Sequence, residues 1–313
     1  MLQTLRRFLL GLPFFLCACA DDGTCKIASV GDLQVLNSRG SPIVKASVNG
    51  HPVAFIVDSG AQFSSIWPNQ VDKLGLVSQF RQVRMHGVGG ETMGDIVIAD
   101  KLGLGSATAS DVPFIAVGNL FDGHAIDGLP VVGLFGADFL SSYDVIFDLP
   151  EHRINIYDIH GCKKQLPEWR GNFSKIKVEH WWRDSTKIVL HLKLNGHPIE
   201  AFLDSGAFRT LISRDDALEA GVRKSDLKQD RQGLGFGIDD EKTARFFHRF
   251  DSLELGSFRF NHPVLSVAET DNSLLGAEFL RHYQVWIPQR GDWIYAKPAS
   301  AARTTPASAE PNH

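Results

Sequence analysis

The tetrapeptide Asp-Ser-Gly-Ala occurs twice in this sequence, at residues 58–61 and again at residues 204–207. A single copy would carry little functional information, because Asp, Ser and Gly are common turn residues. Two copies matter more, since two carboxylates held a few ångströms apart cannot both ionise and therefore share one proton. Such a pair can deprotonate a water molecule and protonate a scissile carbonyl. Asp58 and Asp204 are therefore the candidate catalytic residues.

The residues that follow each aspartate suit this chemistry. The serine can exchange hydrogen bonds with the other copy, and the glycine removes a side chain where two backbones must approach closely. The alanine offers no hydroxyl that would stabilise the ionised pair, which predicts a pH optimum less acidic than that of gastric-type enzymes. The predicted supporting residues are Ser59, Gly60, Ala61, Ser205, Gly206 and Ala207.

The two copies belong to a longer internal repeat. Residues 48–61 and 194–207 share the pattern Asn-Gly-His-Pro, an apolar run and Asp-Ser-Gly-Ala. Further along, residues 134–140 and 274–280 match as apolar-apolar-Gly-Ala-acid-Phe-Leu, in the same order and at nearly the same offset. The sequence therefore predicts a duplicated domain whose two halves bring the aspartates together on a pseudo-two-fold axis.

Each half is predicted to be mostly β. Asn-Gly pairs at 49–50 and 195–196 are strong hairpin signals, and each precedes an apolar run that is expected to be a buried strand ending at the aspartate. Short helices are expected at 68–74, at 213–220 and after Gly136 and Gly276, and closing hairpins at 145–157 and 285–295.

Each half also has a glycine-rich stretch between its two repeated blocks, at residues 85–90 and 233–237. We interpret both stretches as flaps over the site, which would exclude water and bind substrate backbone as an added strand. The alternative is two mobile turns. The predicted flap residues are His86, Gly87, Gly89, Gly90, Gly235, Phe236 and Gly237.

These motifs resemble the aspartic peptidases of the retropepsin and pepsin group. Residues 56–61 and 202–207 are similar to the catalytic loop of that family, and residues 134–136 and 274–276 to the segment that supports this loop from beneath. The resemblance implies an all-β, bilobal, pseudo-two-fold acid-protease fold with two β-barrel lobes, a few short helices and an active site between the lobes. It implies a peptide or protein substrate and no cofactor.

The sequence departs from the family in two places. Both catalytic loops have Ser where Thr is commoner. Neither predicted flap carries the tyrosine of pepsin-like enzymes, so the two-flap arrangement of the retroviral enzymes is the closer comparison.

The N-terminus is typical of an export signal. Two arginines precede a nine-residue apolar run at 8–16, which is too short to span a bilayer. Signal peptidase cleavage after Ala20 would release a chain beginning at Asp21, whereas residues 16–19 resemble a lipobox that would place a lipid anchor on Cys19. A buried N-terminal helix is the third alternative. We expect export to the periplasm or cell envelope, with secretion as a variant of that prediction.

Composition and cysteine content exclude several classes of function. The chain has 313 residues, 43% of them hydrophobic and 22% charged, with a net charge of −4 and no basic stripe for nucleic acid. The sequence contains neither a Cys-x-x-Cys nor a His-Glu-x-x-His motif, so no such motif indicates a metal site. Cys25 and Cys162 can form a disulfide in an oxidising compartment, and two free thiols are the alternative.

These observations predict six segments. They are a signal at 1–20 (or 1–18 for a lipoprotein), an extension at 21–42, a lobe at 43–160, a linker at 161–180, a second lobe at 181–298 and a disordered tail at 299–313. The predicted function is an aspartic endopeptidase, which needs no dimerisation because both lobes lie in one chain. The alternatives are a catalytically silent peptide-binding module and an envelope protein used for assembly or adhesion.

Overall fold

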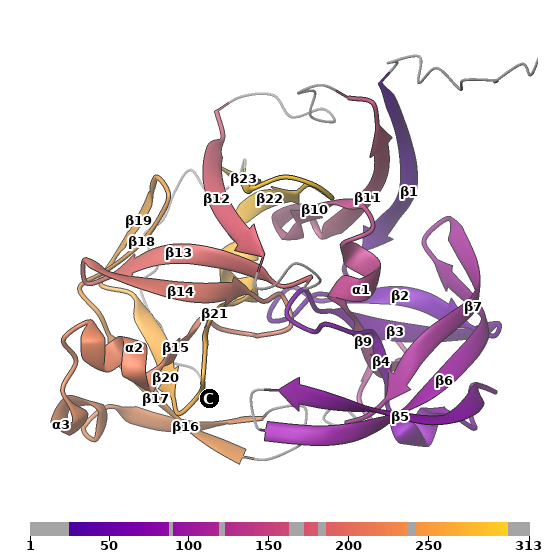
Figure 1. The fold of residues 1–313 in the computed structure, drawn as a ribbon, viewed down its shortest axis with the longest axis horizontal. Coiled ribbons are helices and arrows are strands. Elements are labelled where there is room, and N and C mark those ends of the chain that lie inside the picture. Colours follow the sequence, from indigo (N-terminus) through magenta and orange to yellow (C-terminus); the bar gives the residue numbers. More distant parts are fainter. Residues whose placement is uncertain are drawn as a thin grey trace, which may run out of the picture.

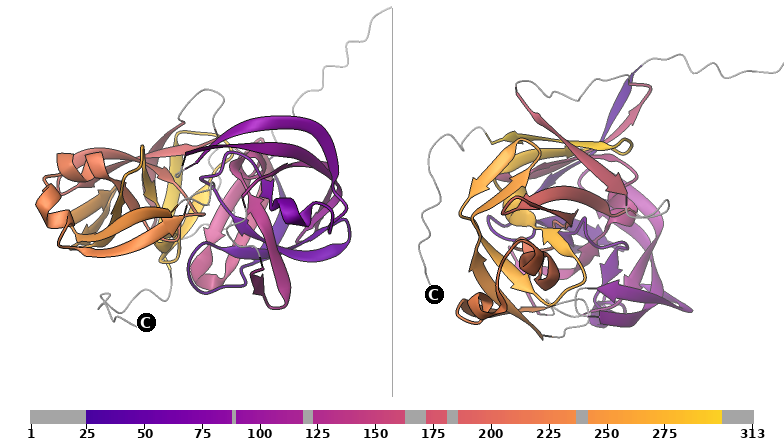
Figure 2. Two further views of the ribbon diagram at one scale, coloured as in Figure 1. Left: turned by 90° about the horizontal axis from the view of Figure 1, so that it is seen from below. Right: turned by 60° about the vertical axis from the view of Figure 1, so that its left-hand side comes forward.

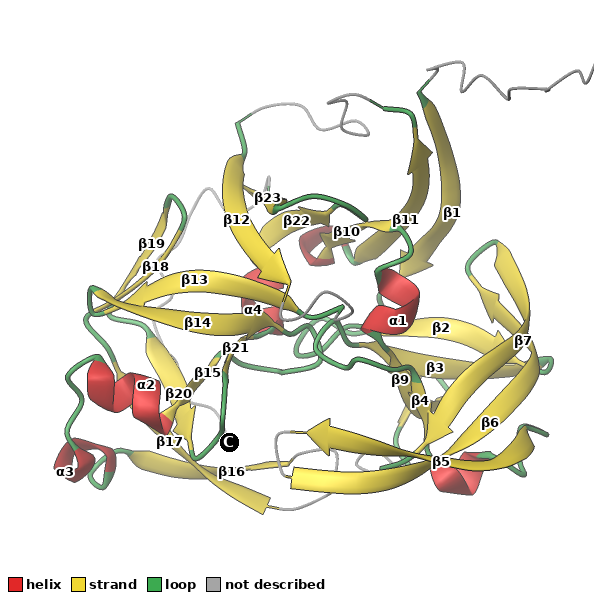
Figure 3. Ribbon diagram, in the orientation of Figure 1, coloured by secondary structure: helices red, strands yellow, loops and turns green. Residues whose placement is uncertain are grey.

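The computed structural model describes residues 25–87, 90–118, 123–162, 172–180, 186–236 and 242–299. Over these ranges the chain forms two β-rich lobes that lie side by side, joined by a sheet to which both contribute (Figures 1 and 2). The helices are few and short (Figure 3). Among the described helices, none is long and apolar enough to cross a membrane.

The N-terminal lobe is a closed β-barrel. Its elements are β2 (Ile43–Val48), β3 (His51–Val57), β4 (Ser65–Ile66), η1 (Pro68–Gln70), β5 (Val77–Gly87), β6 (Gly90–Leu104), β7 (Ala107–Ala116), β8 (Ala125–Ile126), β9 (Leu129–Phe135) and α1 (Ala137–Leu140). The strand order is β2-β3-β9-β4-β7-β6-β5, and the long strand β6 also pairs with β2. That second pairing closes the barrel around a core that contains the stacked rings of Phe55 and Phe135.

The C-terminal lobe repeats this plan. Its elements are β13 (Ile188–Leu194), β14 (His197–Leu203), β15 (Leu211–Ser213), α2 (Arg214–Glu219), α3 (Lys224–Leu227), β16 (Arg231–Phe236), β17 (Lys242–Arg249), β18 (Ser252–Leu255), β19 (Phe258–Asn261), β20 (Val264–Ala268), β21 (Ser273–Leu275) and α4 (Ala277–Leu280). Here β17 and β18 together do what β6 does alone, since β17 pairs with β20 and β18 with β13.

A sheet shared by the two lobes lies between them. Its elements are β1 (Lys26–Gln34), β10 (Asp144–Asp148), η2 (Leu149–Glu151), β11 (Arg153–His160), β12 (Ser174–His180), β22 (Tyr283–Ile287) and β23 (Trp293–Pro298). The order β1-β11-β10-β22-β23-β12 is itself pseudo-symmetric, and antiparallel pairing of β10 with β22 joins the lobes at its centre. The all-β, bilobal, pseudo-two-fold fold predicted from the sequence is therefore confirmed.

The local sequence explains the start of each segment that leads to Asp58 or Asp204. Asn49, Gly50, Asn195 and Gly196 all have positive φ, as a two-residue hairpin turn requires. The strand that follows in the N-terminal lobe is buried without interruption from Val53 to Val57, as the apolar run predicts. In the C-terminal lobe the exposed Glu200 interrupts burial, which is continuous only from Ala201 to Leu203.

Two segments are more ordered than the sequence suggested. The predicted extension contains β1, and the C-terminal end of the predicted linker forms β12, so both are strands of the shared sheet. In β12, Ile176 and Val178 are buried while their neighbours face outward, a period of two that marks a half-buried strand. The signal and the tail lie outside the described residues. The helix expected at 68–74 is reduced to η1.

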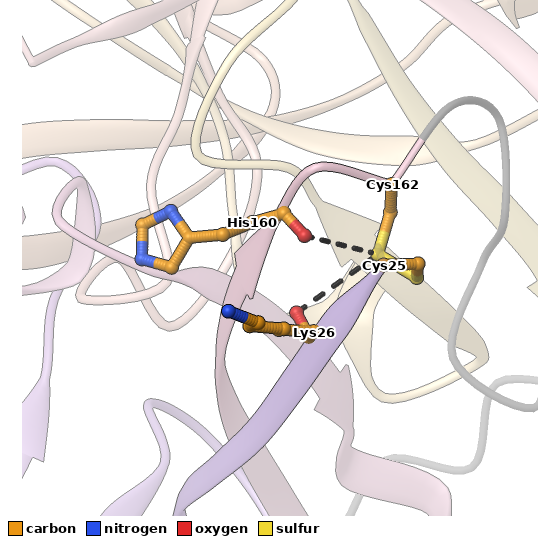
Figure 4. The surroundings of a disulfide bond; sticks show 4 residues. All are labelled: Cys25, Lys26, His160 and Cys162. Carbon is orange, nitrogen blue, oxygen red and sulfur yellow. Dashed lines mark hydrogen bonds between the residues drawn. A yellow bond between two sulfur atoms is a disulfide. The ribbon is translucent and has the colours of Figure 1, made fainter. Parts of the chain in front are cut away.

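A disulfide between Cys25 and Cys162 fastens one edge of the shared sheet (Figure 4). The two cysteines flank the first pair of the β1–β11 ladder, Lys26 with His160. The bridge therefore ties the start of the described chain to the end of the N-terminal lobe. The predicted pairing is confirmed, and the alternative of two free thiols is excluded.

Candidate active site

Asp58 and Asp204 each lie at the carboxyl end of a strand that is paired in parallel with a later strand of the same lobe. β3 pairs with β9, and β14 pairs with β21. The ladders end with the amide of Asp58 donating to the carbonyl of Phe135 (2.8 Å) and the amide of Asp204 donating to that of Leu275 (3.0 Å). Each aspartate therefore leaves the interior of its lobe in the same manner, and each is partly exposed.

The serines after the aspartates lock the two loops together across the lobe boundary. The hydroxyl of Ser205 accepts the amide N–H of Ser59 (2.9 Å) and donates to the carbonyl of Val57 (2.7 Å). Reciprocally, the hydroxyl of Ser59 accepts the amide N–H of Ser205 (3.0 Å) and donates to the carbonyl of Leu203 (2.9 Å). Both serines are buried, so these four hydrogen bonds are shielded from water and fix the separation of the aspartates.

The glycines of the two loops let the carboxyl groups face each other. A Cβ atom added at Gly60 would overlap the carboxyl group of Asp204, and one at Gly206 would overlap that of Asp58. Oδ1 of Asp58 accepts hydrogen bonds from the amides of Gly60 (2.9 Å) and Ala61 (3.0 Å), and Oδ1 of Asp204 accepts one from Ala207 (2.9 Å). The glycines and alanines of the loops thus contact the pair directly, while the two serines join the loops that carry it.

The two carboxyl groups titrate as a pair with raised proton affinity. Burial raises the pKa of Asp58 well above its usual value, and the negative charge of Asp204 raises it further against the pull of the amide donors. Burial also raises the pKa of Asp204, but amide donors oppose this and so does the positive charge of Lys187. When the pair holds a single proton, Asp204 is therefore the member better placed to carry the negative charge.

The second repeated block lies directly beneath the catalytic loops. The amide of Ala137 donates to the carbonyl of Ala61 and that of Ala277 to the carbonyl of Ala207, both at 2.8 Å. A Cβ atom at Gly136 would meet the backbone of Phe63, which explains why the repeat keeps a glycine there. These contacts agree with the supporting role that the family resemblance implies.

An acidic residue in each supporting helix holds the loop from its far side. Asp138 accepts hydrogen bonds from the amide (3.0 Å) and the hydroxyl (2.7 Å) of Ser64. In the other lobe, Glu278 accepts the amide N–H of Thr210 (2.9 Å). Asp138 and Glu278 occupy the one acidic position of the second repeated block, and their hydrogen bonds give this match a shared structural role.

The glycine-rich stretches lie in two equivalent hairpins, β5–β6 and β16–β17, which run along the same edge of the molecule from opposite lobes (Figure 1). Gly87 pairs with Gly90, and Gly235 pairs with Thr243. Gly89 and Gly237 lie outside the described residues. So do the side chains of His86 and Phe236, although their backbones take part in the ladders.

Three residues near the site were not identified from the sequence. The hydroxyl of Ser41 donates to the carbonyl of Gly206 (2.6 Å), and Arg281 donates to the carbonyls of Gly40 and Asn37, so the loop before β2 is held against the opposite lobe. Arg245 of β17 lies close enough to Asp204 for their charges to interact. No repeat or turn signal marks these positions, since each acts through a contact distant in sequence. Among the described residues, no group of three or more His, Cys, Asp or Glu side chains is arranged to hold a metal ion.

Comparison with known sequences agrees with this geometry. The chain matches the family model described as aspartyl protease over residues 44–139 and 190–279. It is 33% identical over 106 residues to DNA damage-inducible protein 1 of Cryptococcus neoformans, and 31% identical over 102 residues to UBA domain-containing protein Mud1 of Schizosaccharomyces pombe. These matches cover 33% and 32% of this chain but only 23% and 30% of those proteins. The chain thus corresponds to less than a third of each of these curated relatives.

A solved structure shares the two-lobed arrangement. The crystal structure of basic 7S globulin from soybean superposes with a TM-score of 0.51, covering 88% of this chain and 96% of that one. The sequences are 11% identical over this match, so the likeness concerns the fold alone.

Proposed function

The chain belongs to the aspartyl protease family, and from this we propose that it is an endopeptidase in which Asp58 and Asp204 activate water to hydrolyse peptide bonds. The observation that carries the proposal is the reciprocal serine lock, the pair of reciprocal hydrogen bonds between Ser59 and Ser205, which holds two partly exposed carboxyl groups face to face. A pair held this way can keep one proton and use it. Both carboxyl groups come from one chain, so the enzyme is expected to act as a monomer.

The first chemical step uses the two carboxyl groups in opposite roles. Ionised Asp204 takes a proton from a water molecule as the water oxygen attacks the scissile carbonyl carbon. Protonated Asp58 gives its proton to the carbonyl oxygen, which would otherwise become an oxyanion. The product is a neutral gem-diol, and the proton of the pair has moved from Asp58 to Asp204.

The second step restores the starting state. Asp204 gives its proton to the amide nitrogen as the carbon–nitrogen bond breaks, and Asp58 takes a proton from one hydroxyl of the gem-diol. A carboxylic acid and an amine are released, and the pair again holds a single proton on Asp58. The amide donors to Oδ1 of each aspartate keep the carboxyl planes fixed through both steps.

The enzyme is proposed to work outside the cytoplasm. Support comes from the signal-like first twenty residues and from the Cys25–Cys162 disulfide, which is a bond that persists in oxidising compartments. Mass spectrometry of the processed N-terminus separates the two forms of export. A free Asp21 indicates a soluble product, a diacylated Cys19 indicates a lipoprotein, and an unprocessed Met1 in a cytoplasmic fraction contradicts export.

Digestion of a mixed peptide library tests the proposed activity. The mature protein is expected to cut internal peptide bonds at mildly acidic pH, and a statine-containing peptide, which imitates the gem-diol, is expected to abolish cutting at one inhibitor per chain. Intact peptides at every pH between 3 and 8 would contradict the proposal, and binding of uncut peptides would then favour a peptide-binding module.

A further inference from the structure

The two flaps carry their large side chains on different strands. In the N-terminal flap, Val83 of β5 is paired with Gly94 of β6, whereas in the C-terminal flap Gly233 of β16 is paired with Arg245 of β17. Counting along the ladders from the parallel pairs β4–β7 and β15–β20 places Gly94 and Arg245 at the same position of the duplicated fold. At this position of the flap the N-terminal lobe therefore has a glycine and the C-terminal lobe an arginine.

The glycines of β16 make room for the side chains of β17. A Cβ atom at Gly235 would overlap the guanidinium group of Arg245, and one at Gly233 would lie 2.8 Å from the ring of Phe247. Arg245 and Phe247 are two residues apart on one strand, so both side chains lie on the same face of the hairpin and cross the glycines beside them. These flap glycines thus position an arginine and an aromatic ring.

The face that carries Arg245 and Phe247 is turned toward the segment after Ala207, because the guanidinium of Arg209 lies 5.8 Å from the ring centre of Phe247. Burial lowers the pKa of Arg245, and the negative charge of Asp204 acts in the opposite direction. The Nε atom is buried and has no hydrogen-bond partner, and no ion pair within the described ranges involves this side chain. Arginine stays protonated in proteins, so Arg245 places a positive charge on the C-terminal-lobe side of the pair and has a hydrogen-bond donor to spare.

Two more guanidinium groups gather on the same side. Arg231 and Arg209 lie 4.7 Å and 5.8 Å from the ring centre of Phe247, and Arg209 comes from the segment just after the catalytic loop. Neither forms an ion pair with a carboxylate in the described part of the chain, and both instead contact aromatic faces. Three arginines therefore lie around Phe247 and its strand on the C-terminal-lobe side of the site.

The N-terminal side has the opposite character. There Met85 of the flap packs with Ile115 of β7 and with Val117 just after that strand, and Phe63 and Val83 join this apolar cluster. A Cβ atom at Gly94 would collide with the side chain of Ile115, so the cluster fills the place that Arg245 occupies in the other lobe. A peptide lying between the flaps would meet the half-buried Phe63 and Val83 at one end and positive charge at the other.

We propose that Arg245, assisted by Arg209 and Arg231, binds the side-chain carboxylate of the substrate, so that the enzyme prefers peptides with Asp or Glu near the scissile bond on the C-terminal-lobe side. This inference rests on the proposed peptidase function. A carboxylate would supply an acceptor for the unpartnered Nε–H group of Arg245, in a charge-assisted pair that Asn or Gln cannot reproduce. Arg245 is thus a specificity-determining residue rather than a proton carrier.

The experiment compares amidated peptide libraries that differ only in Asp and Glu versus Asn and Gln. Wild type is expected to cut the acidic peptides on the order of 10–100-fold better at one position, the range set by a hydrogen-bonded charge. Arg245→Gln should reduce this preference to near unity while still cutting the amide peptides. Arg249→Gln, an exposed arginine of the same strand that contacts the carbonyl of His262, should keep it.

Binding to the Asp58→Asn protein, measured by fluorescence anisotropy with the same peptides, separates this inference from the peptidase proposal. Tighter binding of the acidic peptide that disappears on adding Arg245→Gln supports the subsite even if no peptide is cut. If the proteins that keep Arg245 bind and cut acidic and amide peptides equally well, that result would overturn the proposed carboxylate subsite. So would an Arg245→Gln variant that slows both classes alike, which would assign the residue to the dyad, or a preference seen only with unblocked C-termini.

Discussion

The reciprocal serine lock should hold the lobes together, and Ser59→Ala tests this. The Ser59 hydroxyl lies 3.0 Å from the amide nitrogen of Ser205 and 2.9 Å from the carbonyl oxygen of Leu203, and its removal leaves both groups without this partner. Ser59 is only 5% exposed, so water does not readily replace the hydroxyl. A buried polar group left unpaired costs about 1–3 kcal/mol. Because two groups lose their partners, Ser59→Ala is expected to lower the free energy of unfolding by about 2–6 kcal/mol.

Urea unfolding followed by tryptophan fluorescence and circular dichroism measures this loss. Ser205→Ala should cost a similar amount, and the double variant should cost less than the sum, since the two hydroxyls share one network. Ser106→Ala, at an exposed turn, should stay within about 0.5 kcal/mol of wild type. If Ser59→Ala also stayed within that margin, the lock would not be what fixes the two loops.

Further predictions concern the pH dependence of activity and stability, the supporting loop and the disulfide. Because burial raises both carboxyl pKa values, activity should vanish when the pair is doubly protonated or doubly ionised and peak above pH 3, so a pH–rate maximum below about 3 contradicts the assignment. Because the folded pair binds its proton more tightly than the unfolded carboxyl groups do, it stabilises the fold at pH values below the pKa of the unfolded groups. This stabilisation is lost as the pH rises through the pKa of the folded pair. The melting temperature of Asp58→Asn should therefore gain on wild type from pH 4 to 8, and a constant difference would refute this. Gly276→Ala pushes a Cβ into the backbone of Arg209, so calorimetry should show at least about 1–3 kcal/mol of lost stability together with lost activity. Cys25→Ser should cost about 2–4 kcal/mol and increase hydrogen exchange in β1 first, which exchange mass spectrometry checks; uniform exchange would argue against local release.

The catalytic pair can be predicted from the sequence alone because the two halves of the chain are an internal repeat. Asp58 and Asp204 stand in matched blocks, so symmetry predicts their meeting without knowledge of any contact. The supporting glycines follow for the same reason. The hairpin turns at Asn49 and Asn195 were predictable from backbone chemistry, since Asn-Gly tolerates two successive positive φ angles.

The parts that escaped prediction depend on contacts between distant segments. β1 and β12 acquire their roles only when the two lobes share a sheet, and neither has a motif of its own. Arg245 appears in the sequence as an ordinary charged residue, and its position beside Asp204 depends on the ladder between β16 and β17. Repetition predicts what the halves have in common, whereas substrate preference is expected to follow from what they do not share.

The most direct test of the account compares cleavage of one peptide substrate by wild type, Asp58→Asn, Asp204→Asn and the exposed control Asp100→Asn. Each dyad variant replaces one proton-carrying oxygen by an amide nitrogen and keeps the shape of the side chain. We predict that each lowers kcat/KM by about 10²–10⁴-fold or more while Asp100→Asn leaves it unchanged, since each carboxyl performs a separate proton transfer. Full activity in either dyad variant would contradict the assignment of Asp58 and Asp204 as a catalytic pair.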